Sequence, residues 1–185
     1  TGLPIRLDPG APDTDSDIFR VNVDDCCGIG VNPINLTNSP TLIEDDPHWS
    51  PDGTKIVYTA HDVNDNPPGP FFNYPTTEIF VINADGSGSP VQLTFNNEEE
   101  RAATWSPDGS KIVFMCRYGG GTDFEICTIN PDGSGLVQLT NNTVQELSIR
   151  WSVDGQKFFF NRPAPMRNQL FSINVDGTGL TQLTN

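Results

Sequence analysis

The stretch that decides the fold is residues 48–57, which read His-Trp-Ser-Pro-Asp-Gly-Thr-Lys-Ile-Val. The pattern returns at 104–113 as Thr-Trp-Ser-Pro-Asp-Gly-Ser-Lys-Ile-Val, and with changes at 150–159 as Arg-Trp-Ser-Val-Asp-Gly-Gln-Lys-Phe-Phe. Self-similarity at such spacing is typical of arrays of small structural units. The chain is therefore expected to be a repeat protein.

Two further blocks follow each copy of this stretch. The first contains an apolar run that ends in Asn-x-Asp-Gly, and the second reads Gln-Leu-Thr. The Asp-Gly blocks occupy 78–86, 125–133 and 169–177, and the Gln-Leu-Thr blocks occupy 92–94, 138–140 and 182–184. Three complete units are thus visible in the sequence.

Each unit has the local chemistry of an antiparallel meander. In Ser-Pro-Asp-Gly, proline sets φ at the second turn position and glycine accepts a positive φ. The run after the lysine, such as 56–58 or 158–160, is β-branched or aromatic and too short for a helix. Each unit therefore predicts four antiparallel strands, and no helix of any length is expected.

The amino-terminal stretch looks like an incomplete unit. Residues 17–24 match the Asp-Gly block and 35–38 match the Gln-Leu-Thr block, with 3–7 expected to supply the strand before them. The Trp-Ser-Pro-Asp-Gly strand is missing there. We expect a single domain, 1–185, with units at 1–38 (partial), 39–95, 96–141 and 142–185.

These blocks resemble the WD40-like repeats of TolB-type β-propellers, in which Trp-Ser-Pro-Asp-Gly-x-Lys-Ile is followed by Asp-Gly-Ser-Gly and Leu-Thr. The resemblance covers nearly the whole chain from Asp17. It implies an all-β propeller of four-stranded antiparallel blades, about four in this chain, the first incomplete. It also implies a role in protein binding, or as an accessory domain of serine peptidases.

The missing innermost strand leaves three arrangements open. The chain could form a four-blade ring with a three-stranded first blade, a segment of a larger ring, or an open array completed by a neighbouring copy. The three arrangements differ in what covers the first and last sheets. An exposed strand edge is a template for pairing with another strand, and repeat arrays need capped ends.

The net charge of the chain indicates which classes of binding partner to expect. The chain has 24 acidic and 10 basic residues, a formal net charge of −14. Such a field repels nucleic-acid phosphates and anionic lipid headgroups. No apolar run approaches the roughly 18 residues of a membrane-spanning helix, so membrane insertion is not expected. The composition favours an extracellular or periplasmic location.

Recognisable catalytic machinery is absent from the sequence. The chain has two histidines, His48 and His61, and no Gly-x-Ser-x-Gly elbow. His48 precedes a repeat tryptophan and is expected to pack between blades. We therefore expect a non-enzymatic protein-interaction or assembly scaffold that binds through loops, chiefly 60–77 and 24–33. The alternatives are a self-assembling subunit that pairs through blade edges and an accessory propeller fragment of a hydrolase or peptidase.

The cysteines predict disulfide chemistry. Cys127 takes a position that phenylalanine fills in the other units, and a two-residue turn at 121–122 would set Cys116 opposite it, close enough for a bond. A slipped register would leave two buried thiols instead. Cys26 and Cys27 are adjacent, and in an oxidising compartment they would form a vicinal disulfide or links to another chain.

The sequence also contains a candidate calcium site and two candidate glycosylation sites. The insertion at 60–77 contains Asp-Val-Asn-Asp-Asn-Pro-Pro, which over these few residues resembles the calcium-binding linker of cadherins. Asp62, Asn64 and Asp65 are the candidate ligands, although a solvated turn explains the same composition. Calcium is the one cofactor that the sequence suggests. Asn35 and Asn141 begin glycosylation sequons, of which Asn141 lies in the more exposed connection.

Overall fold

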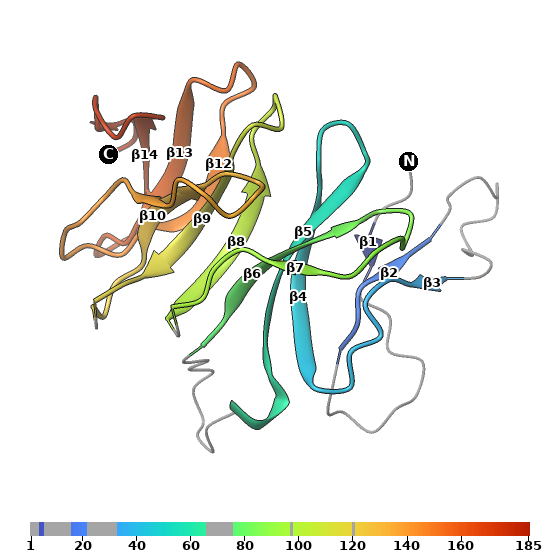
Figure 1. Ribbon diagram of the computed structural model, residues 1–185. Coiled ribbons are helices and arrows are strands. Elements are labelled where there is room, and N and C mark those ends of the chain that lie inside the picture. Colours follow the sequence, from blue (N-terminus) through green and yellow to red (C-terminus); the bar gives the residue numbers. More distant parts are fainter. Residues whose placement is uncertain (1–3, 6–15, 22–32, 66–75, 97, 120) are drawn as a thin grey trace.

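A computed structural model of the chain describes residues 4–5, 16–21, 33–65, 76–96, 98–119 and 121–185 (Figure 1). The described residues form antiparallel sheets and one short 3-10 turn, Val63–Asp65. No helix in these described residues is long and apolar enough to cross a membrane.

Four sheets follow one another along the chain, and we number them in that order. The first contains β1 (Pro4–Ile5), β2 (Phe19–Arg20) and β3 (Ile34–Asn35). The second contains β4 (Leu42–Trp49), β5 (Lys55–Asp62), β6 (Glu78–Asn83) and β7 (Val91–Gln92). The third contains β8 (Glu99–Trp105), β9 (Ile112–Arg117), β10 (Glu125–Ile129) and β11 (Val137–Gln138). The fourth contains β12 (Leu147–Trp151), β13 (Lys157–Arg162), β14 (Gln169–Asn174) and β15 (Thr181–Gln182). The predicted fold, four-stranded antiparallel blades with an incomplete first blade, is confirmed.

The turn between the first two strands of a unit forms as its residues predict. The amide of Gly53 donates to the carbonyl of Ser50 at 2.9 Å, and Gly53 takes a φ of 71°. The Asp52 carboxylate accepts from the Ser50 hydroxyl at 2.6 Å and from the Thr54 amide at 2.9 Å. The copy with Val153 in place of proline closes in the same way, because this turn type does not require proline.

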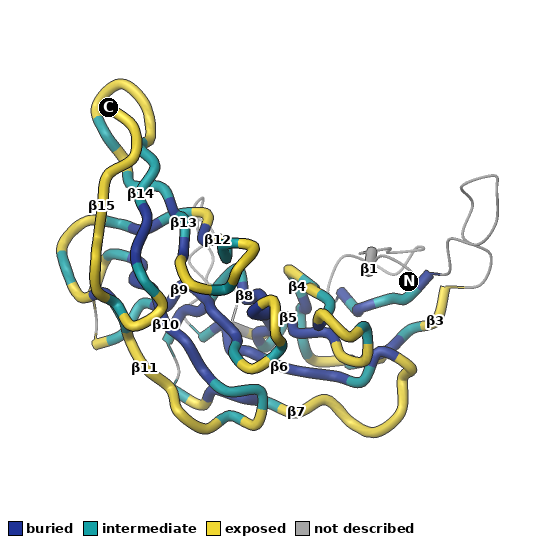
Figure 2. The backbone as a smooth tube through the Cα atoms, turned by 90° about the horizontal axis from the view of Figure 1, so that it is seen from above, coloured by how far each residue is buried: buried dark blue, intermediate teal, exposed yellow. Residues whose placement is uncertain are grey.

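The sheets stack face to face along an arc. Figure 2 shows the first sheet at one end of the arc and the fourth at the other. A separate apolar cluster lies between each pair of neighbours, and residues 56–58, 112–114, 158 and 160 are buried in these clusters. Most of the apolar burial therefore comes from contacts between sheets.

One predicted register is wrong. Cys127 lies opposite Phe114, and Cys116 lies opposite Glu125. The register repeats in the other complete units, where Tyr58 faces Phe80 and Phe160 faces Phe171. The repeat register thus prevails over the two-residue turn expected at 121–122, and the residues between β9 and β10 form a longer connection.

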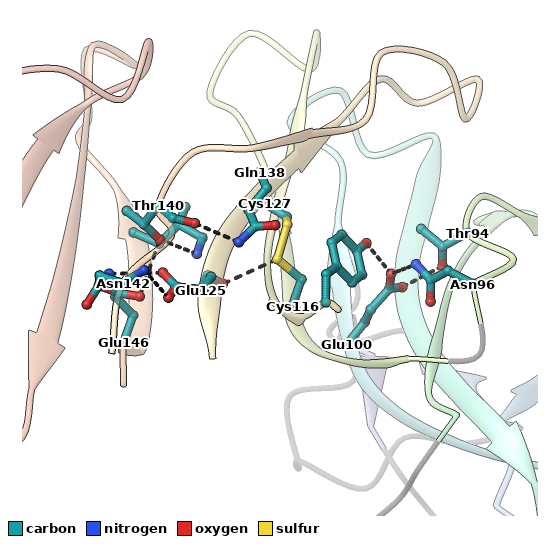
Figure 3. The surroundings of a disulfide bond; sticks show 12 residues. Thr94, Asn96, Glu100, Cys116, Glu125, Cys127, Gln138, Thr140, Asn142 and Glu146 are labelled. Atoms are coloured by element: carbon teal, nitrogen blue, oxygen red, sulfur yellow. Dashed lines mark hydrogen bonds between the residues drawn. A yellow bond between two sulfur atoms is a disulfide. The ribbon is translucent and has the colours of Figure 1, made fainter. Parts of the chain in front are cut away.

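The two cysteines are nevertheless joined. The structure contains a disulfide between Cys116 and Cys127, whose Cα atoms lie 5.9 Å apart on a diagonal of the hairpin (Figure 3). A diagonal pair shares one face of the sheet, so its side chains can meet. The predicted pairing is present although the predicted register is not. Cys26 and Cys27 lie outside the described residues.

Candidate functional site

The repeat tryptophans connect neighbouring sheets. The indole nitrogen of Trp105 donates to the carbonyl of His48 at 3.2 Å, and that of Trp151 donates to the carbonyl of Thr104 at 3.4 Å. In each case the acceptor residue directly precedes the tryptophan of the preceding sheet. The His48 imidazole also lies 3.3 Å from the Thr104 hydroxyl. His48 therefore contacts the next sheet, as its position predicts, although it stays exposed to solvent.

Buried glutamates make a second repeated contact between sheets. In the first three units, the threonine of the Leu-Thr block donates to a glutamate that lies in, or directly before, the first strand of the next sheet. The pairs are Thr37 with Glu44, Thr94 with Glu100 at 2.5 Å, and Thr140 with Glu146 at 3.3 Å. The glutamate side chains are almost completely buried. Buried carboxylates at such positions require hydrogen bonds.

Figure 3 shows two of these glutamates beside the disulfide, one at each interface of the third sheet. Glu100 also accepts from Asn96 at 2.8 Å and from the Tyr118 hydroxyl at 2.5 Å. Burial raises the pKa of Glu100 to about 7, although these hydrogen bonds and that from Thr94 act in the opposite direction.

Glu146 has the equivalent surroundings. It accepts from Asn142 at 3.0 Å and pairs with Arg162 at 2.6 Å. Burial, followed by the neighbouring Glu125, raises the pKa of Glu146, while Asn142 and Arg162 lower it. These glutamates were not identified from the sequence. Their signal was available, because each lies five residues before a repeat tryptophan.

A polar pocket lies where the second sheet meets the third, at the base of the insertion predicted to bind partners. Its volume is about 200 Å³. It is lined by Asp45 and Asp46 from β4, Thr59 and His61 from β5, Thr77 before β6, and Arg101 from β8. His61 and Thr77 lie at the two ends of the insertion. The pocket is therefore the candidate functional site.

A bulge in β4 positions the acidic side of the pocket. The pairing of β4 with β5 shifts register between Asp45 and His48, and Asp46 has a φ of 52°. Ala102 and Ser148 take the same conformation at the equivalent bulges. Aspartate tolerates this left-handed region better than most residues, so the strand can carry a charge there.

The equivalent place between the third and fourth sheets is filled rather than hollow. Phe124 stands where Thr77 stands in the preceding unit, with the Arg117 guanidinium 4.5 Å and the Arg101 guanidinium 5.4 Å from its ring centre. Register equivalence also places Met115 where the pocket has Thr59. The short side chains of Thr59 and Thr77 thus leave a pocket between the second and third sheets. The larger side chains of Met115 and Phe124 fill the equivalent space between the third and fourth sheets.

The calcium prediction remains untested. The Asp62 carboxylate accepts from both the backbone and the side-chain nitrogen of Asn64, at 2.8 and 2.7 Å. These bonds lower the pKa of Asp62 and form a local turn. The side chain of Asp65 is not described. No group of three or more His, Cys, Asp or Glu side chains that could hold a metal occurs in the described part of the chain.

The two sequons have different surroundings. Asn141 is exposed. Asn35 is partly buried, and its amide nitrogen donates to Asp17 at 2.6 Å while its oxygen accepts from the amides of Thr37 and Asn38. Asn141 therefore stays the better predicted glycosylation site.

Comparison with known proteins gives a curated relative and similar solved structures. Over 71 residues the chain is 39% identical to dipeptidyl-peptidase 5 from Porphyromonas gingivalis, a match that covers 38% of this chain and 10% of that protein. A putative TolB from Agrobacterium tumefaciens superposes with a TM-score of 0.72 at 20% identity, over 98% of this chain and 59% of that one. A chain of a nidogen/laminin complex superposes with a TM-score of 0.65 at 12% identity, over 92% and 57%.

These comparisons differ in what they establish. The chain spans a tenth of the curated relative and about three fifths of the TolB structure. The solved structures share its fold. The family described as TolB beta propeller domain (PD40) matches residues 11–185, nearly the whole chain and all three complete repeat units. The chain therefore belongs to the TolB β-propeller family.

Proposed function

We propose that the chain is a non-enzymatic binding propeller that acts outside the cytoplasm and recognises a protein partner. The observation that supports this most directly is the polar pocket at the base of the 60–77 insertion. In ligand-binding pockets, a few precisely placed polar groups fix the orientation of the ligand and give specificity. One of the similar propellers comes from a nidogen/laminin complex, an assembly of proteins.

One observation supports the location, and a second supports the kind of partner. The Cys116–Cys127 disulfide suits an oxidising compartment such as the periplasm or the extracellular space. The net charge of −14 favours a basic protein partner over nucleic acid or an anionic membrane.

Site-specific photo-crosslinking tests the binding proposal. A photoreactive benzoylphenylalanine replaces Asn64, which is exposed in the insertion, and in a control replaces Gln156, which is exposed in the turn before β13. With the extracytoplasmic proteins of the source organism, we expect a discrete adduct from position 64, competed by unlabelled protein, and none from 156. Equal labelling from both positions, or no adduct, would contradict the proposal.

Self-association is a second candidate, supported by the face of the fourth sheet on which none of the described residues of another sheet packs. In the second and third sheets the turn proline and the Gln-Leu-Thr leucine approach the next sheet; in the third, Pro107 packs near Gly155 and Leu139 near Gly177. Their counterparts Val153 and Leu183 are 98% and 47% exposed. Light scattering over a concentration series tests this candidate, and a monomer throughout the series excludes it.

A third candidate is an accessory propeller of a larger hydrolase. It is supported by the similarity to dipeptidyl-peptidase 5 over 71 residues. The complete reading frame tests it, because a hydrolase requires a nucleophile with its general base in another domain. A reading frame that encodes only propeller repeats would exclude this candidate.

A further inference from the structure

We infer that the pocket between the second and third sheets binds a primary ammonium group, either a lysine side chain or the amino terminus of a partner. This inference rests on the proposed binding function and specifies its chemistry.

The volume of the pocket suits the end of a single side chain. At about 200 Å³ the pocket exceeds a single water, which occupies about 30 Å³ in the liquid. It is smaller than the roughly 300 Å³ at which pockets for whole small molecules begin. The phenylalanine at the equivalent place in the next interface shows the scale of group that the stacking of sheets accommodates.

The charges favour a cation. Asp45 and Asp46 line the pocket, and Glu99 lies next to it through its ion pair with Arg101. Three carboxylates and two guanidinium groups, those of Arg101 and Arg117, therefore lie in or beside the pocket, and the sum of these charges is negative. His61 lines the same pocket and is 4% exposed.

An anion is a poor fit, because the nearby guanidinium groups are already engaged. Arg101 pairs with Glu99 and lies over the Phe124 ring, and Arg117 pairs with the same glutamate at 2.6 Å. An anionic ligand would compete with Glu99 for both.

A divalent metal is also a poor fit. Calcium takes six to eight oxygen ligands, and no group of three metal-binding side chains occurs among the described residues. An ammonium group instead has three donors. The carboxylates and the hydroxyl oxygens of Thr59 and Thr77 that line the pocket are acceptors for them.

The inference is tested by titration of the ¹⁵N-labelled protein with three small probes, monitored by amide chemical shifts at constant pH. Nα-acetyl-lysine N-methylamide supplies a side-chain ammonium, glycylglycine N-methylamide supplies an amino-terminal one, and Nα-acetyl-norleucine N-methylamide is neutral. We expect saturable shifts at residues 45, 46, 59, 61 and 101 with one or both ammonium probes. Which probe binds identifies the source of the group. Equal shifts with norleucine, or shifts spread over the surface, would overturn the inference.

Two variants of the pocket and one control variant sharpen the test. Thr77→Phe installs the residue that fills the next interface and should abolish the saturable shifts. Asp46→Asn retains a residue that tolerates the left-handed backbone, and we expect binding about tenfold weaker, which corresponds to about 1.4 kcal/mol. Asp123→Asn removes the same charge outside the pocket and should leave affinity unchanged. If Asp46→Asn and Asp123→Asn behave alike, the pocket is not the site.

The two levels of proposal can fail separately. If no ammonium probe binds but the position-64 adduct persists, the ammonium assignment is wrong and the binding function stands. If the adduct is absent as well, neither proposal survives.

Discussion

A strained, left-handed backbone conformation recurs at the equivalent residue of three sheets. Asp46, Ala102 and Ser148 have φ values of 52°, 54° and 54°, each two residues after the buried glutamate of its sheet. For a residue other than glycine, this conformation costs about 1–2 kcal/mol. The same bulge in each complete unit indicates that contacts between sheets compensate for the cost.

Ser148→Gly should therefore stabilise the protein. Ser148 is exposed, so little packing is lost. Glycine removes the steric cost but gains freedom in the unfolded chain, and we expect a net increase in the free energy of unfolding of about 0.5–1 kcal/mol. Urea unfolding measures it. Ser148→Ala, which keeps the strain, is the control, and equal stability of the two variants would rule out strain as the cause.

The disulfide is the second prediction at this scale. Cys116 and Cys127 enclose a short loop, with a sequence separation of 11. The chain-entropy model gives about 3 kcal/mol for a loop near this length. We expect a reductant to lower the free energy of unfolding by about 2–4 kcal/mol. The Cys116→Ala/Cys127→Ala double variant should be insensitive to reductant, and a matching loss in that variant would show that the reductant acts elsewhere.

At the scale of elements, the threonine–glutamate contacts hold adjacent sheets together. Thr94 accepts from the amide of Ile79 at 2.8 Å and donates to Glu100 on the next sheet. Thr184 makes the equivalent amide contact with Leu170, at 2.9 Å, but its hydroxyl donates to Gln169 of its own sheet. The two threonines thus differ in whether they bridge sheets.

Thr94→Val should cost more stability than Thr184→Val. The first substitution leaves a buried carboxylate and a buried amide without that partner, which costs about 1–3 kcal/mol for each unsatisfied group. The second affects exposed groups that water can reach, so its cost should stay below about 1 kcal/mol. Thermal or urea unfolding of both variants measures the difference. Equal losses would show that the threonine acts within its own sheet only.

The buried glutamates make stability depend on pH. The folded-state pKa of Glu100 is about 7, above its ordinary value of 4.5, so folding takes up a proton between these values. The stabilisation is present below the ordinary pKa and is lost as pH rises through 7. We expect the free energy of unfolding to fall between pH 5 and pH 8 by on the order of 3 kcal/mol.

Urea titrations at several pH values measure this dependence. Glu100→Gln should flatten the profile, because an amide cannot titrate. Glu146 contributes with the same sign, so the double variant with Glu146→Gln should be flatter still. A profile that rises from pH 5 to pH 8, or one that both variants leave unchanged, would contradict the assignment.

At the scale of the whole molecule, stability should vary along the arc. The third sheet has a neighbour on both faces, whereas among the described residues the fourth packs only against the third (Figure 2). In repeat arrays stability is nearly a sum of unit and nearest-neighbour terms. Amide hydrogen exchange should therefore be slower in β9 and β10 than in β13 and β14. Mass spectrometry of peptides from each strand measures it, and uniform protection would indicate that the array opens only as one cooperative unit.

Much of the fold could be predicted because its determinants are local. Ser-Pro-Asp-Gly specifies a turn wherever it occurs, and the β-branched or aromatic runs that follow it specify strands. The recurrence of these blocks was enough to identify the propeller, the number of sheets and the incomplete first sheet. The register of Cys116 and Cys127 was mispredicted because a single hairpin was considered without the register that its neighbouring units share.

The sequence by itself determined the repeat units, their turns and strands, and the position of the insertion, because these depend on residues close together along the chain. Only the tertiary structure decided which glutamates are buried, where Cys116 meets Cys127, and that Asp46, His61 and Arg101 surround one pocket. Those groups come from different strands or different sheets. Their separation depends on how one sheet stacks on the next, which no local pattern encodes.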